Sequence, residues 1–191
     1  MNAGHRFNNE LRYRDDDHEL QRQLTPSYVL EPVRSALGGI ELDPCTEPNN
    51  PTGADRFYAR PTDGAAESWE AQSIFCNPPY SKARERWVDR CMEAAERGSR
   101  VVLLMPSHTD TRTFHKAIRT ASHVLFIKGR VKFGVLRDNG RQEAASHPSC
   151  LICWNLTNVS PLAKLGAIWT VNGIAHSQVA ANDSTSLRSA A

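Results

Sequence analysis

Between residues 25 and 154 the chain alternates short, continuously apolar runs with longer amphipathic segments. The short runs are typical of strands buried on both faces of a sheet, and the longer segments have the spacing of helices with one apolar face. This alternation predicts an α/β domain with a mainly parallel sheet covered by helices on both faces. Strands are expected at residues 40–44, 73–76, 100–105, 123–127 and 149–154, and helices near residues 26–37, 81–97 and 110–121. Thr25 is expected to cap the first helix and Ser81 the second, and the third is expected to begin at Thr109 or Asp110.

Three parts are expected along the 191 residues. Residues 1–24 are a polar arm without periodicity, residues 25–154 hold the α/β domain, and residues 155–191 form an extension with a disordered tail rich in Ser, Ala, Asn and Thr. Residues 45–72 are rich in Pro, Asn, Thr and Gly and are expected to form loops with one helical turn at most. A short strand or half of a hairpin is expected over residues 130–135.

The composition excludes several classes of protein. The chain has no apolar run of about 18 residues, which a membrane-spanning helix needs, and its first residues lack the apolar stretch of an export signal. Five scattered cysteines do not form a disulfide framework, so a reducing cytoplasm is expected. The sequence does not indicate the oligomeric state.

No metal site is expected. Cys150 and Cys153 form a lone C-x-x-C inside an apolar run, which fits a buried strand better than a zinc or redox site. The histidines at positions 108, 115, 123 and 147 do not have metal-ligand spacing, and no role is assigned to them.

Charge is distributed unevenly although the net charge is only +2. Residues 82–141 hold 14 basic against 6 acidic residues, whereas residues 1–81 hold 7 against 13. A basic segment in a nearly neutral chain favours binding to a polyanion, although the mixed charges of residues 82–100 also fit a solvated helix surface. After residue 100, acids are nearly absent around most of the basic residues. The candidates for DNA contacts are Lys82, Arg84, Arg112, Lys116, Lys128, Arg130 and Lys132.

The strand at residues 73–76 runs directly into Asn77-Pro78-Pro79-Tyr80. The Asn77 carbonyl and the Pro78 backbone carbonyl are suited to accept the two hydrogens of an exocyclic amine as positive charge develops on its nitrogen. The prolines fix φ and hold the carbonyl in place, and Tyr80 offers an aromatic face to a base taken out of the duplex stack. The alternative is a plain strand-to-loop turn.

The run from Leu24 to about Trp154 resembles the small phage-type DNA N6-adenine methyltransferases of the Dam family. The matching features are Thr25-Pro26, Leu42-Asp43-Pro44-Cys45, Asp63-Gly64 followed by Trp69, Phe75-Cys76-Asn77-Pro78-Pro79-Tyr80-Ser81, Trp87-Val88 and Gly129-Arg130-Val131-Lys132-Phe133. The resemblance implies a Rossmann-like fold, S-adenosylmethionine as cofactor, double-stranded DNA as partner, and methyl transfer to the N6 amino group of adenine. Residues 77–80 would then be catalytic.

By the same resemblance, Thr25, Pro26, Asp43 and Pro44 would hold the methionine end of S-adenosylmethionine. No G-x-G-x-x-G follows Asp43, and the short distance to Asn77 requires a trimmed sheet. Asp55 and Asp63 are candidates for the acid that binds the ribose. The alternative for Asp43 is a turn-forming Asp-Pro.

Two other functions remain open from the sequence. Asn-Pro-Pro-Tyr also occurs in enzymes resembling amino-methyltransferases of RNA or of protein glutamine, which usually carry a Gly-rich cofactor turn. The missing Gly-rich turn also fits a non-catalytic relative that binds nucleic acid.

Overall fold

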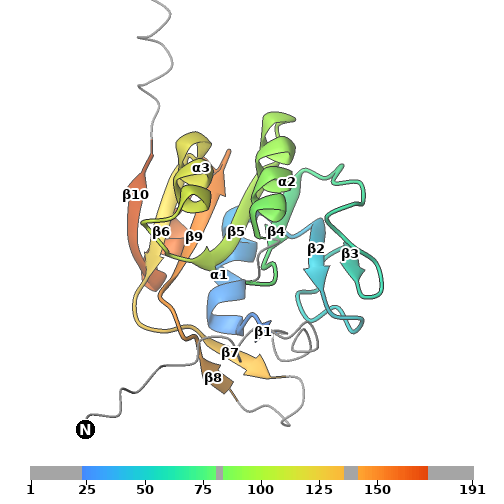
Figure 1. Ribbon diagram of the computed structural model, residues 1–191, viewed down its shortest axis with the longest axis horizontal. Helices are drawn as coiled ribbons and strands as arrows, with labels where there is room; N and C mark the ends of the chain where they lie inside the picture. The colour runs from blue at the N-terminus through green and yellow to red at the C-terminus, as the bar shows by residue number, and fades with distance from the viewer. Residues whose placement is uncertain (1–22, 81–83, 136–141, 172–191) are drawn as a thin grey trace, which may run out of the picture.

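A computed structural model describes residues 23–80, 84–135 and 142–171 (Figure 1). Its strands are β1 (Gln23–Leu24), β2 (Leu42–Thr46), β3 (Arg56–Ala59), β4 (Ser73–Cys76), β5 (Arg100–Pro106), β6 (His123–Ile127), β7 (Lys132–Val135), β8 (Gln142–Ala144), β9 (Ser149–Trp154) and β10 (Gly166–Thr170). Its helices are α1 (Ser27–Leu37), α2 (Arg84–Glu96), α3 (Arg112–Thr120) and the short 3-10 helix η3 (Ser160–Leu165).

The main sheet has the strand order β10-β6-β9-β5-β4-β2-β3. Strands β3, β2, β4 and β5 are mutually parallel, and β9 is antiparallel to both of its neighbours, β5 and β6. β6 therefore points the same way as β5, and only β9 and β10 run in the opposite direction. The predicted α/β fold with a mainly parallel sheet is confirmed. Between β2 and β4 the chain forms only β3, so the sheet is trimmed on this side.

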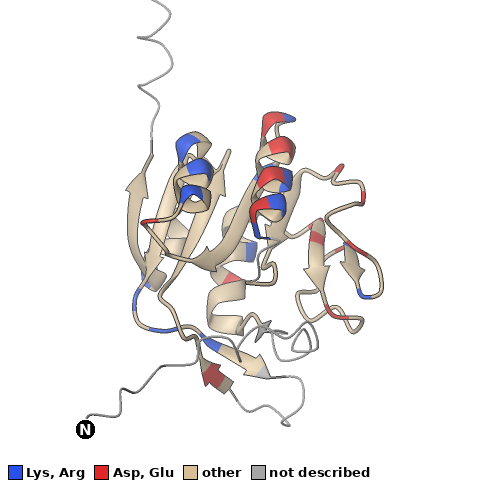
Figure 2. Ribbon diagram, viewed as in Figure 1, with Lys and Arg blue, Asp and Glu red and all other residues tan. Residues whose placement is uncertain are grey.

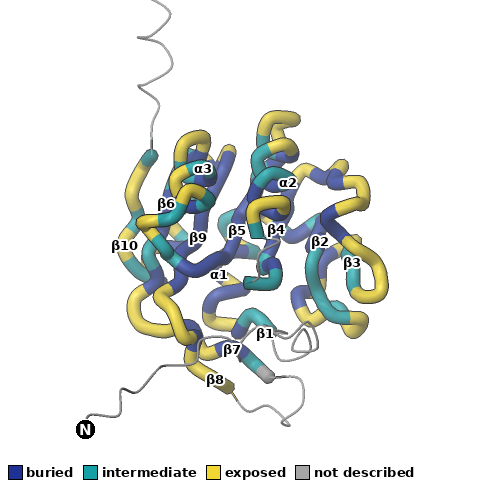
Figure 3. Tube along the Cα trace, in the orientation of Figure 1, coloured by how far each residue is buried: buried dark blue, intermediate teal, exposed yellow. Residues whose placement is uncertain are grey.

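Helices cover the two faces of the main sheet, as expected. α1 packs on one face, where Val29, Val33 and Leu37 join the apolar side chains of β5 and β9. α2 and α3 pack on the other face through residues such as Val88 and Phe114. Figure 3 shows the central strands buried between these layers.

Strand β9 shows why the Cys-x-x-Cys run is structural. All six of its residues are buried, and Cys150 and Cys153 belong to the hydrophobic clusters on opposite faces of the sheet. Both thiols are free, and the described part of the chain holds no group of three or more potential metal ligands. The expectation of a buried strand is confirmed.

Two helix starts differ from the sequence-based expectation. α3 was expected to begin at Thr109 or Asp110, but Thr111 is its cap, because the Thr111 side chain accepts from the backbone N–H of Phe114. Thr25 was expected to cap α1, yet Pro26 occupies the cap position without a side-chain hydrogen bond. Thr25 therefore lies outside the helix. The Ser81 expected to cap α2 lies outside the described residues.

A second, small sheet has the order β1-β7-β8. β7 and β8 pair as an antiparallel hairpin, and Leu24 of β1 pairs with Gly134 of β7. The expected half-hairpin over residues 130–135 is thus the strand β7, and the last residues of the polar arm are its partner. This sheet lies beyond the carboxyl ends of the main parallel strands, below them in Figure 1.

The segment after residue 154 contributes to the same fold. η3 packs against α1 through the buried residues Leu162 and Leu165, and β10 pairs along the whole of β6. Residues 160–170 therefore complete one edge of the main sheet. No helix in the described ranges is long and apolar enough to span a membrane.

Loops at the other edge were only partly predicted. The loop-rich region of residues 45–72 contains β3, a four-residue strand that pairs with β2 in parallel. β3 is exposed to half-buried and lacks a long apolar run, so pairing with β2, rather than local pattern, defines it.

Candidate active site

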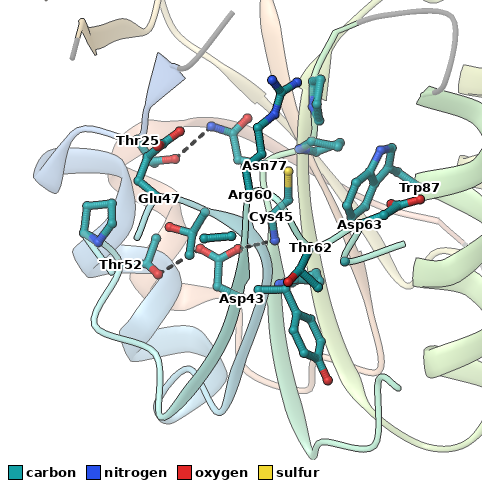
Figure 4. A pocket seen from close by; sticks show the side chains of 18 of the residues that line it. Thr25, Asp43, Cys45, Glu47, Thr52, Arg60, Thr62, Asp63, Asn77 and Trp87 are labelled. Atoms are coloured by element: carbon teal, nitrogen blue, oxygen red, sulfur yellow. Dashed lines mark hydrogen bonds between the residues drawn. The ribbon is translucent and has the colours of Figure 1, made fainter. Parts of the chain in front are cut away.

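A cavity of about 370 Å³ opens at the carboxyl ends of β2 and β4. Ligands in open α/β sheets bind at this edge because the loops that follow the strands gather there. The cavity is lined both by the end of β2 and by the motif Asn77–Tyr80 that follows β4 (Figure 4). The two polar sequences singled out above thus meet in one site. Thr25, Asp43 and Pro44 line it together with the four motif residues, whereas Pro26 is buried beside it.

Asn77 is held by residues on both sides. Its side-chain nitrogen donates to the Thr25 hydroxyl oxygen over 3.1 Å, and its carbonyl oxygen accepts from the Tyr80 hydroxyl over 3.3 Å. The two hydroxyls hold the amide between them, with its nitrogen toward Thr25 and its oxygen toward Tyr80. Thr25 therefore orients Asn77, a role that its expected position as a helix cap does not predict.

Tyr80 is positioned by two neighbouring elements. Its ring meets Phe133 of β7 edge-on, with the ring centroids 6.2 Å apart, and the guanidinium of Arg84 lies 5.9 Å from its centroid. Burial raises the pKa of the Tyr80 hydroxyl above its usual value, so the hydroxyl stays protonated and can donate to Asn77. The small sheet and the start of α2 thus both contact the motif Asn77–Tyr80.

Asp43 is almost completely buried, with 1% of its surface exposed. One carboxylate oxygen accepts from the backbone N–H of Cys45 over 3.0 Å, and the other accepts from the Thr52 hydroxyl over 2.8 Å. Burial raises the pKa of Asp43 to about 6, although these hydrogen bonds act in the opposite direction. Asp43 therefore organises a turn and also lines the cavity, so the two interpretations of this residue are compatible.

Replacing Asp43 by Asn is expected to stabilise the fold near neutral pH. The folded-state pKa lies above that of the unfolded chain, so the folded state takes up a proton as the pH falls through about 6. The buried charge therefore costs stability above pH 6, and a shift of about two units corresponds to at most roughly 3 kcal/mol. An asparagine side chain carries no charge at any pH, and its amide oxygen can still accept from the backbone of Cys45.

The measurement is urea unfolding of both proteins between pH 5 and pH 8. The stability advantage of Asp43→Asn should be largest at pH 8 and should shrink toward pH 5. A difference that does not change with pH would mean that Asp43 does not titrate in this range.

The loop after β2 explains how the cavity forms without a Gly-rich turn. Asn50, at φ 48°, exchanges side-chain hydrogen bonds with the backbone of Ala54, and Thr52 is tied to Asp43. From α1, the Arg34 side chain donates to the backbone carbonyls of Thr52 and Gly53. Side-chain hydrogen bonds thus shape this loop, whereas the corresponding turn in dinucleotide-binding folds uses glycines.

Of the two acids considered for binding the ribose, one lines the cavity and the other does not. Asp63 lines the cavity and forms an ion pair with Arg86 (2.7 Å), whereas Asp55 lies outside the cavity. Glu47 lines the cavity as well, directly after β2, and was not singled out from the sequence. Its place at the carboxyl end of a strand, four residues after Asp43, is the signal that would have found it.

The predicted DNA-contact residues do not form one group. Lys82 lies outside the described residues, and Arg84 begins α2 beside the motif Asn77–Tyr80. Lys128, Arg130 and Lys132 lie on and after the connection between β6 and β7, near the small sheet. Figure 2 shows this basic connection at the same edge of the molecule as the small sheet.

Two of the predicted DNA-contact residues, Arg112 and Lys116, lie on α3 and differ in their surroundings. Arg112 is exposed at the first position of the helix. Lys116 pairs with Asp89 (2.5 Å) and with Glu85 (3.4 Å), both on α2. Acids that are distant in sequence therefore balance Lys116 in space, and the expectation that it lacks acidic neighbours is wrong.

Comparison with known proteins identifies the family. The family model of DNA N-6-adenine-methyltransferase (Dam) matches residues 14–175, which includes both sides of the cavity. The chain belongs to this family. The predicted family, the enzyme class of methyltransferase and the cofactor S-adenosylmethionine are thereby confirmed, and the RNA- or glutamine-directed alternatives are not favoured.

A solved structure is also similar, although only distantly. A SAM-dependent O-methyltransferase from Thermotoga maritima shares 13% sequence identity, with a TM-score of 0.32 over 55% of this chain. The match spans 41% of that structure's length, so the chain covers less than half of it. A comparison with the curated proteins gave no match.

Proposed function

We propose that this Dam-family chain transfers a methyl group from S-adenosylmethionine to the N6 amino group of adenine in double-stranded DNA. The observation that carries the proposal is that one cavity is lined by both the Asp43 end of β2 and the motif Asn77–Tyr80. A donor bound along β2 and an amine held by the motif would then meet in one space. Family membership supplies the choice of adenine in DNA.

The residues of the cavity fit S-adenosylmethionine. The cofactor supplies a methyl group activated by a positively charged sulfonium, and it also carries an ammonium group and ribose hydroxyls. Asp43, Glu47 and Asp63 provide carboxylates for these groups, while Tyr58 and Trp87 provide aromatic walls. The volume of about 370 Å³ lies in the usual range for small-molecule sites. Of the two acids considered for the ribose, Asp63 is the one we propose, because it lines the cavity and Asp55 does not.

The motif supplies two acceptors for the target amine. The Asn77 carbonyl and the Pro78 backbone carbonyl would each accept one N–H, which makes the nitrogen lone pair available for attack. These hydrogen bonds strengthen as positive charge develops on the nitrogen, so they favour the transition state. Thr25 keeps the Asn77 carbonyl oriented, and the Tyr80 ring offers a stacking surface for the adenine.

The DNA would approach the carboxyl edge of the sheet, where the cavity opens. Arg84 and Arg112 begin helices there, and Lys128, Arg130 and Lys132 flank the small sheet. Tyr28 of α1 is 46% exposed beside this segment, and its hydroxyl accepts from the backbone N–H of Lys132. Exposed cations next to an aromatic side chain are typical of nucleic-acid surfaces.

Replacing both Lys128 and Lys132 by Ala is expected to weaken DNA binding and to lower its salt dependence. Both side chains are exposed, and no carboxylate in the described ranges pairs with either. Removal of one phosphate-binding cation should reduce the slope of log affinity against log salt by roughly 0.9. Arg130 is left in place because it donates to the Ser146 carbonyl and so supports the local backbone.

The measurement is fluorescence anisotropy with a labelled duplex across a salt series. Arg97→Ala combined with Arg119→Ala is the matched control, because it removes the same charge near the carboxyl ends of α2 and α3, away from the cavity. If the control lowers the slope as much as the lysine double variant, the basic connection is not the DNA-contacting surface.

The central test is incubation of the purified chain with labelled S-adenosylmethionine and unmethylated duplex DNA, followed by nucleoside analysis. The expected product is N6-methyl-2′-deoxyadenosine. Parallel reactions with RNA and with a glutamine-containing protein acceptor should remain unlabelled. Calorimetric titration with the cofactor separates a non-catalytic relative from an enzyme with another acceptor, because only the enzyme needs the donor. Asp43→Asn should weaken this binding about tenfold or more, through loss of one charge-assisted hydrogen bond.

A further inference from the structure

Two histidines without an assigned role meet beside the catalytic motif. The rings of His108 and His147 contact edge to face, with centroids 4.5 Å apart. His108 follows β5, and His147 precedes β9, so antiparallel pairing of these strands brings the two residues together. Because 39 positions separate them in the sequence, their spacing gives no sign of this pair.

Arg84 joins the histidines to the active site. A guanidinium nitrogen of Arg84 lies 3.5 Å from Nδ1 of His108, and the same guanidinium lies over the Tyr80 ring. Since arginine can only donate, Nδ1 of His108 accepts and the neutral ring carries its proton on Nε2. Arg84 therefore links the Tyr80 ring to the histidine pair.

The path continues toward the basic connection described above. Arg130 donates to the backbone carbonyl of Ser146 over 2.9 Å, and Ser146 immediately precedes His147. The histidine pair thus lies between Arg84, next to the catalytic motif, and Arg130, beside the small sheet. A nucleic-acid strand passing over this edge would meet these cations one after another.

The cluster has an excess of positive charge. No carboxylate in the described part of the chain forms an ion pair with Arg84, and its buried Nε–H has no hydrogen-bond partner there. The groups that face His108 are His147, Arg84 and one acid, Asp110. Burial lowers the pKa of His108, and the neighbouring His147 and Arg84 lower it further, whereas Asp110 raises it. The ring is therefore neutral near pH 7 in the absence of an anion.

We infer that Arg84, His108 and His147 form a binding site for a backbone phosphate of the DNA, next to the nucleotide whose base lies at Tyr80. This inference rests on the proposed function. A phosphate between Arg84 and His108 would accept from the guanidinium and from a protonated imidazole, and it would replace the long contact between the two side chains. Charge-assisted hydrogen bonds of this kind are the strong ones in phosphate recognition.

Phosphate binding at this site is coupled to proton uptake. A phosphate would raise the pKa of the His108 imidazole above its value in the free protein, so DNA binding is favoured at lower pH. The contribution is complete below the pKa of the free protein and is lost as the pH rises through the pKa of the complex. For each proton taken up, affinity changes roughly tenfold per pH unit between these two values.

The experiment compares wild type with the double variant His108→Gln/His147→Gln, using the full chain, a short adenine-containing duplex and no cofactor. Affinity is measured from pH 6 to pH 8.5, and proton uptake at pH 7 is measured by calorimetry in buffers of different ionisation enthalpy. Wild type should bind about tenfold more tightly at pH 6 than the variant, take up a proton on binding, and match the variant at pH 8.5.

His123→Gln is the matched control. His123 is the first residue of β6, at the amino ends of the parallel strands and so at the end of the sheet opposite the cavity. Its ring contacts the Ser122 hydroxyl. This control should keep the pH dependence of wild type. If the double variant is folded and also keeps that dependence while wild type methylates DNA, the phosphate site is overturned and the proposed function stands. If wild type neither binds nor methylates DNA, both are overturned.

Discussion

Replacing Asn77 by Ala is expected to lower the rate of methyl transfer to adenine by about 10²–10³-fold, the usual cost of losing one preorganised group that stabilises the transition state. The effect should fall on kcat, because the Asn77 carbonyl acts most strongly as charge develops on the amine. Cofactor affinity should change little, since Thr25 and Asp43 remain in place. Steady-state kinetics and calorimetric titration with S-adenosylmethionine measure the two quantities separately.

Tyr80→Phe is the companion variant. It removes the hydroxyl that donates to Asn77 but keeps the ring and both acceptors. Activity within about tenfold of wild type is expected, because stacking and the Asn77 carbonyl survive. If Asn77→Ala were as active as wild type, Asn77 would belong to a structural turn. If Tyr80→Phe were as inactive as Asn77→Ala, the hydroxyl itself would carry the reaction.

Replacing Gly64 by Ala is expected both to destabilise the fold and to abolish cofactor binding. A Cβ at Gly64 would lie 1.8 Å from the backbone oxygen of Pro44, a clash that only a shift of the backbone can relieve. Gly64 also accepts from the indole N–H of the buried Trp69 over 2.8 Å. Overpacking of this kind costs typically 1–3 kcal/mol, and here it would push apart two walls of the cavity.

Gly166→Ala is the control for this prediction. Its Cβ would lie 2.0 Å from the backbone oxygen of Phe126, so the steric conflict is comparable, but the site is the pairing of β10 with β6, away from the cavity. Both variants should unfold at lower urea concentration than wild type. Only Gly64→Ala should lose cofactor affinity in a titration of the folded protein, and an equal decrease in both variants would point to general destabilisation.

The parts of the fold that the sequence predicted share one physical property. β4, β6 and β9 begin and end where they were expected, because each is a continuous apolar run buried on both faces. The motif Asn77–Tyr80 was located for the same reason, since it follows such a strand. β3 was missed because its four exposed to half-buried residues show no apolar pattern, and its partner β2 defines it.

Contacts between distant residues account for the rest. Thr25 bonds to Asn77 across 52 positions, and Lys116 pairs with acids of the preceding helix. The His108–His147 pair likewise exists only because β5 and β9 are adjacent. Local sequence contains no signal for such neighbours, so their roles could be assigned only from the arrangement of the strands.

Among the described residues, those that line the cavity lie between Leu24 and Trp87, whereas the basic connection and the histidine pair come from residues 108–147. Apart from Arg84, the residues proposed to contact the DNA backbone therefore follow the cavity residues along the chain. Substitutions in the later stretch can alter how tightly the DNA is held without touching the groups that hold the donor. A chain built in this way can change its affinity for DNA while the groups around the donor stay constant.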